Sequence, residues 1–199
     1  MKLYYAPHTC SLSPLIVLNE LGLTHQLIKV DNQTKRTADG RDFRAINPKG
    51  YVAALELENG EVLTEGPAII QYLADLKPDE KLAPPPGSWP RVRLQEMLNF
   101  ITSEIHAGVA PLFNSDLPEA AQAIFRERLL RRMGVLETAL QQHPYLMGDN
   151  YTVADAYLYT ILGWLRFFAI DLSQWPAVAS HTVRVAARPA TEAAERAHV

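Results

Sequence analysis

Cysteine is almost absent from this chain of 199 residues, which contains a single one, Cys10. One cysteine cannot form a disulfide within the chain, so the disulfide-stapled scaffolds of small secreted proteins are excluded. The opening residues Met-Lys-Leu-Tyr-Tyr also lack the apolar segment of a secretory signal. We therefore expect a reduced, cytoplasmic protein.

The sequence also has no long hydrophobic run and no excess of one charge. Its longest apolar stretch, residues 156–170, contains Arg166 and is too short to span a bilayer, so it predicts a buried helix and no membrane segment. The 19 basic and 22 acidic residues give a net charge of −3 without a long block of either sign. We therefore expect no binding to nucleic acid or to an anionic membrane.

What is present is an ordinary globular composition, 48% hydrophobic and 21% charged, and one conspicuous turn. Cys10 lies where residues 2–6, which read as a strand, give way to a helix that begins near Pro14. The start of a helix carries unpaired N–H groups and partial positive charge, which would favour the thiolate form of a sulfur placed there. The spacing alone leaves two alternatives open, a reactive thiol and an inert, buried small residue.

The first part of the chain alternates strands and helices. Strand, helix and strand over residues 2–30 form a unit whose two strands are expected to be parallel. Asn59-Gly60 is typical of a tight hairpin turn between two further strands. The expected elements are strand 2–6, a helix closed by Gly22, strand 25–30, a weak helical patch at 40–47, strands 54–57 and 61–63, and a helix that opens at Gly66-Pro67.

Prolines mark a boundary after this α/β part. Lys77-Pro78 and Pro84-Pro85-Pro86-Gly87 interrupt helices and central strands, and beyond them the periodicity is helical. We therefore divide the chain into a first domain at 1–77, a linker at 78–87 and an all-helical domain at 88–199. The helices expected in the last domain include one from near Ser88, one after Pro118 and a final one from about Pro176 to Ala187, which Arg188-Pro189 interrupts.

Three polar patterns stand out in the helical domain. Asn99, Ser103 and His106 are spaced by four and three residues, so their side chains are expected to share a helix face. Thr152 and Asp155 precede an apolar run with the spacing of a capping box, which we interpret as a folding signal and not as a site. The arginines of the second long helix are assigned mostly to its solvated face; they are Arg126, Arg128, Arg131 and Arg132.

Five motifs follow one another along the whole chain. They are Lys2-Leu3-Tyr4-Tyr5 with residues 10–14, Ile46-Asn47-Pro48-Lys49-Gly50, residues 63–69, residues 98–106 and residues 152–157. In this order they resemble the cytosolic glutathione S-transferases, most closely the bacterial beta class. The resemblance implies a thioredoxin-like first domain with a mixed four-stranded sheet, an all-α second domain and a homodimer. It also implies glutathione as co-substrate and no tightly bound cofactor.

The resemblance assigns site residues position by position. Cys10 and His106 correspond to the catalytic side chains near the glutathione sulfur, and Cys10 can form a mixed disulfide with glutathione. Val52 would pair through its backbone with the cysteinyl part of glutathione, and Lys35 would bind the glycine carboxylate. The other residues implied are Glu65 and Gly66 for the γ-glutamyl part, Asn99 and Ser103 along the groove, and Glu104 from the partner subunit; no metal ligand is implied. Taken singly, several of these residues read as ordinary surface or packing positions.

Two departures from the family pattern concern the same site. Where the family has a cis-proline, this chain has Ala53 after Val52. A cis peptide before alanine costs about 3 kcal/mol or more, against about 0.5 to 1 kcal/mol before proline. Either the fold enforces a cis bond at Ala53, or the bond is trans and the backbone contact of Val52 to glutathione is displaced. We favour the trans bond and hypothesise a distorted, weaker glutathione site. His8 stands where smaller residues are usual, and it either favours the Cys10 thiolate or faces solvent.

These assignments predict an enzyme whose glutathione thiolate attacks a hydrophobic electrophile, or which exchanges thiols with a mixed disulfide through Cys10. Trp164 and Phe167 or Phe168 would line an apolar acceptor pocket, although such aromatics often belong to the core instead. The alternative from a different class is a non-catalytic binding or stress-interaction protein of the same fold. Such a protein would have lost productive glutathione binding through Ala53.

Overall fold

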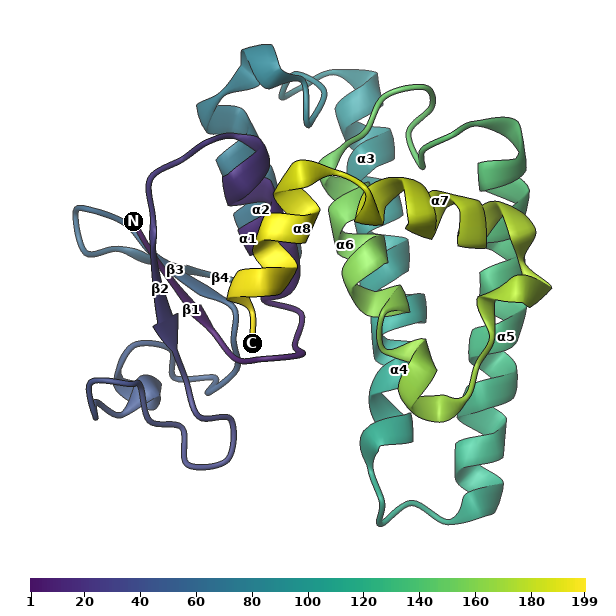
Figure 1. Cartoon of the computed structure of the whole chain (residues 1–199), viewed down its shortest axis with the longest axis horizontal. Coiled ribbons are helices and arrows are strands. Elements are labelled where there is room, and N and C mark those ends of the chain that lie inside the picture. The colour runs from purple at the N-terminus through teal and green to yellow at the C-terminus, as the bar shows by residue number, and fades with distance from the viewer. The chain divides into compact units, whose positions relative to one another are not determined.

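The computed structural model describes residues 1–199, which form two compact units. The first unit contains residues 1–81 together with residues 187–199, and the second contains residues 82–186. Each unit has its own set of internal contacts, so each is described in turn (Figure 1).

The first unit is built on a mixed four-stranded sheet with the strand order β2-β1-β3-β4. β1 pairs in parallel with β2 and antiparallel with β3, and β3 pairs antiparallel with β4. Gly60, in the turn between β3 and β4, has a φ of +85°, which glycine adopts without a side-chain clash. The predicted mixed sheet is confirmed. The strands are β1 (Lys2–Tyr5), β2 (Gln26–Lys29), β3 (Ala54–Glu56) and β4 (Val62–Thr64).

Two helices, α1 (Leu12–Glu20) and α2 (Gly66–Leu76), lie on the same side of this sheet (Figure 1). α1 packs against β1, α2 packs against β3 and β4, and the two helices pack against each other. The helical patch expected at 40–47 is present only as one 3₁₀ turn, Phe43–Ala45, at whose start the Asp42 side chain accepts from the Arg44 N–H. The largest fully buried side chains of the unit include Tyr4, Phe43, Leu3, Leu15, Ile16, Leu18, Leu55, Ile69, Ile70 and Leu73.

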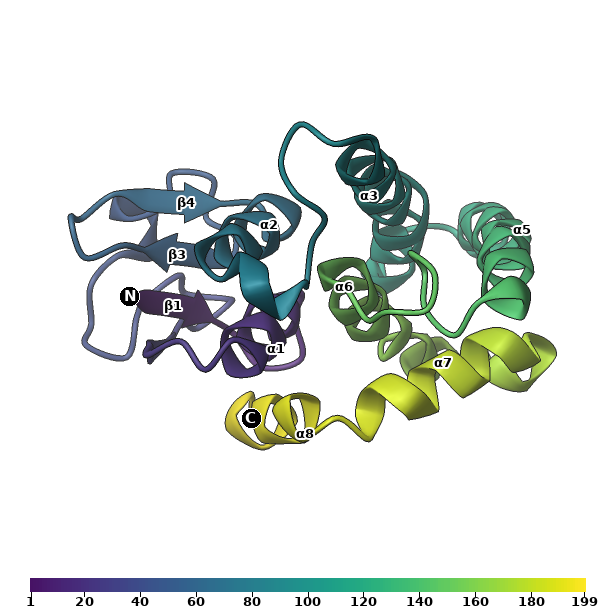
Figure 2. The same ribbon diagram turned by 90° about the horizontal axis from the view of Figure 1, so that it is seen from above.

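The last helix, α8 (Pro189–Ala197), was not expected from the sequence. The helix predicted from Pro176 is present as α7 (Pro176–Ala186) and does end before Pro189. Proline lacks an N–H and fixes φ, so it interrupts one helix but suits the first turn of the next. α8 packs against α1 (Figure 2). Residues 187–199 therefore belong to the first unit, although the sequence analysis assigned them to the helical domain.

The second unit is helical throughout, and α6 (Val153–Leu162) is buried along its whole length. A helix that is apolar on every face must be surrounded by protein, and α3, α7 and the turn after α3 all pack against α6. The apolar stretch 156–170 is not one helix, because α6 ends at Leu162 and a separate 3₁₀ turn follows at Leu165–Phe168. No helix of the protein has the length and apolar character needed to cross a membrane.

The other helical segments of this unit complete the fold. α5 packs against α7 and against the short α4. The segments are α3 (Trp89–Phe100), the π-helical turn Ile101–His106, α4 (Ala107–Val109), the 3₁₀ turn Ala110–Phe113, α5 (Glu119–Gln142) and the 3₁₀ turn Leu172–Gln174.

The capping box predicted at Thr152 and Asp155 is present at the start of α6. One carboxylate oxygen of Asp155 accepts from the Thr152 N–H at 2.8 Å. The other oxygen accepts from the Leu146 N–H at 2.9 Å and lies 2.9 Å from Nε2 of His181. The side chains of Asp155 and His181 are both fully buried. Asp155 therefore joins the start of α6 to α7 and to the loop before α6.

Candidate active site

Cys10 lies in the turn between β1 and α1, one residue before the helix cap Ser11. Its side chain is partly exposed, and its thiol donates to the carbonyl oxygen of Val52 over 3.4 Å. The carbonyl oxygen of Cys10 accepts from the Ser13 hydroxyl at 3.2 Å. The start of α1 and the loop that leads into β3 therefore meet at this thiol.

The Cys10 thiol is held in its protonated form. Desolvation of the sulfur raises the pKa of Cys10 to about 11, more than the N–H groups of Cys10 and Ala53 lower it, and the charge of Glu65 raises it further. The thiolate hypothesised from the helix start is therefore wrong for the protein without ligand, because removing a charge from water outweighs the dipole of the helix end. His8 is exposed, which agrees with the solvent-facing alternative considered for it.

The peptide bond between Val52 and Ala53 is cis. The expected trans bond is thus wrong, and the displaced Val52 contact that was inferred from it loses its basis. Contacts hold the backbone on both sides of this bond: the Asn47 amide donates to the Tyr51 carbonyl at 2.7 Å, and Ala53 is buried. The intrinsic preference of the peptide, which was the basis of the expectation, does not include these contacts.

Glu65 and Gly66 mark the start of α2, close to the Cys10 turn. Glu65 has a φ of +70°, and its exposed carboxylate accepts from Nζ of Lys49 at 2.6 Å. A Cβ atom at Gly66 would lie 4.0 Å from the hydroxyl of Ser13. Lys49 belongs to the motif at residues 46–50, but no role was predicted for it from the sequence. An acid, a base and a helix start side by side suit a zwitterionic α-amino acid group.

Lys35 lies beside the loop that carries Val52. It has a φ of +58°, and its Nζ donates to the side-chain oxygen of Asn32 at 2.8 Å. Nζ also lies 5.5 Å from the ring centroid of Tyr51, which is 71% exposed and directly precedes Val52. The structure thus places Lys35 next to the Val52 loop and gives it an aromatic neighbour that the sequence analysis did not consider.

In the second unit, His106 ends the π-helical turn Ile101–His106. Its Nδ1 lies 2.7 Å from the hydroxyl oxygen of Tyr157, and its ring meets that of Trp164 edge-on with centroids 5.0 Å apart. Because of these contacts His106 is half-buried, whereas Asn99 and Ser103 are exposed. The three residues that were expected to share one face therefore differ in their surroundings.

The aromatic residues predicted to line a pocket form one cluster around Phe113. The ring centroid of Phe113 lies 4.7 Å from that of Phe168, 5.8 Å from that of Trp164 and 6.2 Å from that of Phe167. Phe113 and Phe167 are 52% and 51% exposed, so the cluster is not part of the core. Phe113 was missed from the sequence because it lies in a short 3₁₀ turn without helical periodicity.

Glu104 is engaged by two arginines of α5. Its carboxylate accepts from Nε of Arg132 at 2.6 Å and from Nη2 of Arg128 at 3.0 and 3.1 Å. These hydrogen bonds hold the pKa of Glu104 below its usual value. Arg128 and Arg132 therefore form ion pairs with Glu104, in addition to their predicted place on a mostly solvated helix face. Their partner could not be read from the sequence, because Glu104 lies on another helical segment.

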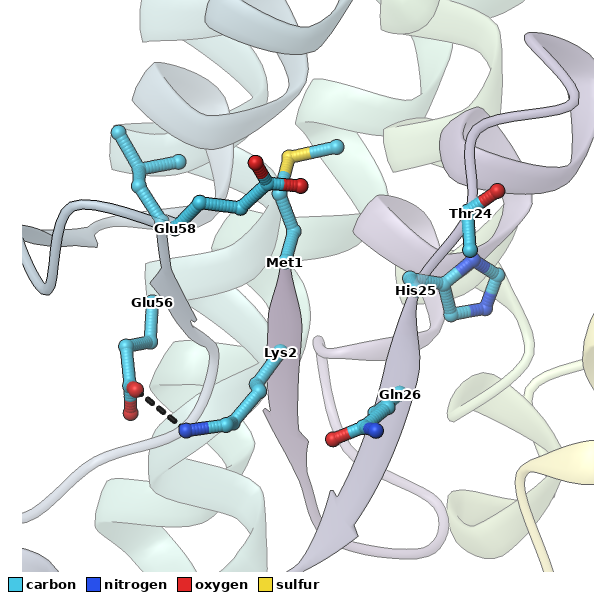
Figure 3. A pocket seen from close by; sticks show the side chains of 8 residues that line it. Met1, Lys2, Thr24, His25, Gln26, Glu56 and Glu58 are labelled. Carbon is cyan, nitrogen blue, oxygen red and sulfur yellow. Dashed lines mark hydrogen bonds and ion pairs between the residues drawn. The ribbon is translucent and has the colours of Figure 1, made fainter.

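A separate cavity of about 340 Å³ opens at the beginning of β1. Figure 3 shows Lys2 bonded to Glu56 there, with Glu58, His25 and Gln26 around them. Cys10 follows the other end of β1, so none of the predicted site residues lines this cavity. No three His, Cys, Asp or Glu side chains are grouped in the protein as metal ligands would be.

Two family models match the chain. The model described as glutathione S-transferase, N-terminal domain, matches residues 9–76, and the model described as glutathione S-transferase, C-terminal domain, matches residues 100–189. The glutathione S-transferase GstA of Escherichia coli O157:H7 is 42% identical over 189 residues, which are 95% of this chain and 94% of that protein.

Solved structures agree with these matches. BphK, a bacterial glutathione transferase solved as a ternary complex, superposes with a TM-score of 0.98 at 47% identity and covers 100% of this chain and 99% of its own. Two sphingomonad transferases, one complexed with glutathione and one of the beta class from Sphingomonas chungbukensis, each have a TM-score of 0.96 at 40% identity and cover 100% of this chain and 98% of theirs. The cysteine turn, the mixed sheet, the all-helical second unit and these likenesses lead to one conclusion: the chain belongs to the glutathione S-transferase family.

Proposed function

We propose that this protein joins glutathione to hydrophobic electrophiles and that Cys10 acts on the glutathione sulfur as a hydrogen-bond donor. The observation that carries the proposal is the protonated Cys10 thiol, which is directed at the Val52 carbonyl 3.4 Å away. A thiol is a weak donor, and a donor beside a sulfur nucleophile stabilises its thiolate form. The Val52 carbonyl then marks the place where the cysteinyl part of glutathione would pair with the backbone.

The charged ends of glutathione find partners on either side of this point. Glu65 would accept from the α-ammonium group, while the start of α2 at Gly66 would receive the α-carboxylate. Lys49 already pairs with Glu65 and would balance the carboxylate. Lys35, beside the Val52 loop, would bind the glycine carboxylate. We propose these roles from the family resemblance together with the contacts described above.

The second unit would supply the remaining groups. His106 is proposed as a second donor to the sulfur, and Asn99 and Ser103 as groove residues. Glu104 would act from the partner subunit of a homodimer. The proposed electrophile pocket consists of Trp164, Phe167 and Phe168, to which the structure adds Phe113. We propose that the protein works in the cytoplasm.

In the conjugation step the glutathione thiolate forms a carbon–sulfur bond and the leaving group departs with the electron pair of the bond that breaks. The thiol proton of glutathione passes to solvent. Thiol exchange is the second candidate, in which the Cys10 thiolate attacks a disulfide sulfur and the other sulfur leaves as a thiolate. The raised pKa of Cys10 makes its thiolate scarce at neutral pH, which favours conjugation. No observation favours the non-catalytic alternative, which rested on impaired glutathione binding through Ala53.

The test compares Cys10→Ser and Cys10→Ala with the wild type, using chlorodinitrobenzene for conjugation and a glutathione mixed disulfide for exchange. Serine keeps a hydrogen-bond donor, so the kcat for conjugation should stay within a few fold of the wild-type value. Alanine should lower kcat by about tenfold, because one hydrogen bond to the sulfur that carries the charge is lost. His143→Ala, at an exposed position, is the matched control. If Cys10→Ala conjugates chlorodinitrobenzene at the wild-type rate, the donor role of Cys10 is overturned. If both variants lose the exchange activity while their conjugation rates stay unchanged, thiol exchange is favoured as the function.

A further inference from the structure

The two neighbours of Cys10 in the chain, Thr9 and Ser11, take part in one buried hydrogen-bond network. The Ser11 side chain is fully buried, and its Oγ lies 2.7 Å from Oγ1 of Thr9 and 3.3 Å from the N–H nitrogen of Ala6. Oγ1 of Thr9 donates to the Ala6 carbonyl at 2.8 Å. Cys10 thus stands between two residues whose hydroxyl groups anchor the turn to the end of β1.

A residue from the other end of the chain completes this network. Nε2 of His198 lies 2.8 Å from Oγ of Ser11, and only 4% of the His198 surface is exposed. The His198 ring also packs against Tyr5, with centroids 5.3 Å apart. His198 directly follows α8, the helix that the sequence analysis missed.

α8 is held in place independently of His198. Arg188, just before α8, forms two hydrogen bonds with the carboxylate of Glu20 in α1, at 2.5 and 2.8 Å. The side-chain amide of Asn19 donates to the Ala190 carbonyl at 3.2 Å. Because these contacts lie at the start of α8, they bring His198 at its end to Ser11 without depending on the Ser11 contact.

The network can be hydrogen-bonded throughout with either tautomer of His198. The Ser11 hydroxyl lies within hydrogen-bond distance of the Thr9 hydroxyl, of the Ala6 carbonyl at 3.3 Å and of the His198 ring. A hydroxyl both donates and accepts, so Nε2 of His198 can donate to Ser11 or accept from it. In each arrangement one hydrogen bond joins Nε2 of His198 to Oγ of Ser11.

We propose that His198 is a positioning residue for the Cys10 thiol, acting through the hydroxyl groups of Ser11 and Thr9. Because side chains that hold a reactive group need partners of their own, the network keeps the turn in the conformation that directs the thiol at Val52. The role of His198 in turnover rests on the function proposed above, whereas its effect on the Cys10 thiol can be measured without glutathione.

The surroundings of His198 keep its ring neutral. Burial, helped by the charge of His8, lowers the pKa of His198 to about 4. A neutral ring has one protonated nitrogen and one lone pair, and a hydroxyl such as that of Ser11 can pair with either. The other aromatic residue against the ring, Tyr5, supplies packing and not charge.

The experiment compares His198→Phe, which keeps a ring against Tyr5 but has no hydrogen-bonding group, with His198→Gln, whose amide can donate or accept from nearly the same place. His143→Phe, at an exposed position, is the matched control. Two quantities are measured: the rate at which iodoacetamide labels Cys10 as a function of pH, and kcat and KM for glutathione. Circular dichroism melting shows which variants are folded at the assay temperature.

With His198→Phe we expect a turn that opens more readily. Labelling of Cys10 at pH 7 should rise about fivefold or more and kcat should fall by a similar factor, as expected for one lost hydrogen bond, while KM for glutathione stays within about twofold. His198→Gln should restore both rates. Equal labelling profiles in wild type and His198→Phe would overturn the proposal, and so would a His198→Gln variant no better than His198→Phe, since the ring alone would then matter.

A double-mutant cycle keeps the proposal testable if His198→Phe melts below the assay temperature. Ser11→Ala removes the same hydrogen bond from its other side, and the double variant removes both partners. If the two residues act through one bond, the effects of the single changes on Cys10 labelling do not add. Additive effects would overturn the proposal. A changed labelling profile without any glutathione turnover in the wild type would refute the proposed function and leave the positioning role intact.

Discussion

The Nδ1 atom of His106 lies 2.7 Å from the hydroxyl oxygen of Tyr157, a side chain that is 1% exposed. Tyr157 belongs to the buried helix α6, so a rigid element of the core holds the histidine ring. The bond engages Nδ1 and so restrains the orientation of the ring.

We therefore expect Tyr157→Phe to weaken catalysis with little change in glutathione affinity. The variant loses one hydrogen bond to His106, worth about 1 kcal/mol, so kcat should fall by about fivefold. The measurement is steady-state conjugation of chlorodinitrobenzene. Tyr145→Phe is the control, because the Tyr145 ring contacts Tyr151 and His181 and not His106. Equal kcat values for Tyr157→Phe and the wild type would show that His106 needs no such support.

Cys10 should react slowly with iodoacetamide at neutral pH. Desolvation raises its pKa to about 11, so the thiolate fraction at pH 7 is roughly a hundredfold lower than that of an unperturbed thiol. The labelling rate of Cys10 should still be rising with pH in the range where the labelling rate of free glutathione has levelled off. Since the chain has one cysteine, labelling of the intact protein followed by mass spectrometry reports on this thiol alone. A rate plateau near pH 8 would contradict the desolvation that raises the pKa of this partly exposed thiol.

Asp155→Asn should strongly destabilise the second unit. Asp155 accepts from two backbone N–H groups and pairs with His181, all in a buried place, and breaking a buried pair costs about 3 kcal/mol or more. Urea unfolding followed by circular dichroism measures the change. Asp171→Asn serves as a control, because Asp171 caps the exposed 3₁₀ turn at Leu172 and its loss should matter little. Similar unfolding midpoints for the two variants would mean that the buried cluster contributes no more than a surface cap.

The stability of the protein should fall between pH 6.5 and pH 4 because of His198. Its pKa is lowered to about 4 in the folded chain and is 6.5 in the unfolded one, so the unfolded chain binds the proton first as the pH falls. The contribution of His198 is complete above pH 6.5 and is lost as the pH falls toward 4, by up to about 3 kcal/mol. His198→Phe lacks this titration. The difference in unfolding free energy between wild type and His198→Phe should therefore shrink on acidification, and parallel curves would refute the assignment.

Local signals predicted much of the fold. Asn59-Gly60 forms the hairpin turn between β3 and β4, Pro67 lies in the first turn of α2, and Thr152 caps α6. Each of these signals acts over a few residues, so it can be read from a short stretch of sequence. The helix α8 was missed because Pro189 was interpreted only as an interruption, although the same proline begins a new helix.

The candidate site was predictable as a set of positions but not as a set of interactions. The motifs located Cys10, Val52 and Glu65, whereas Lys49 and Phe113 were found only through their contacts. The protonation of Cys10 and the cis bond at Ala53 both went against expectations drawn from local preferences. Burial and backbone contacts, which local preferences do not include, decided both.

The sequence by itself therefore determined the strand and helix order, the family and the turn that carries Cys10, because these depend on periodicity, capping and short motifs. Only the tertiary structure decided that His198, 187 positions from Ser11 in the chain, completes the hydrogen-bond network of that turn. The physical reason is that such a bond depends on how α8 packs against α1, and this packing joins parts of the chain that no local pattern relates.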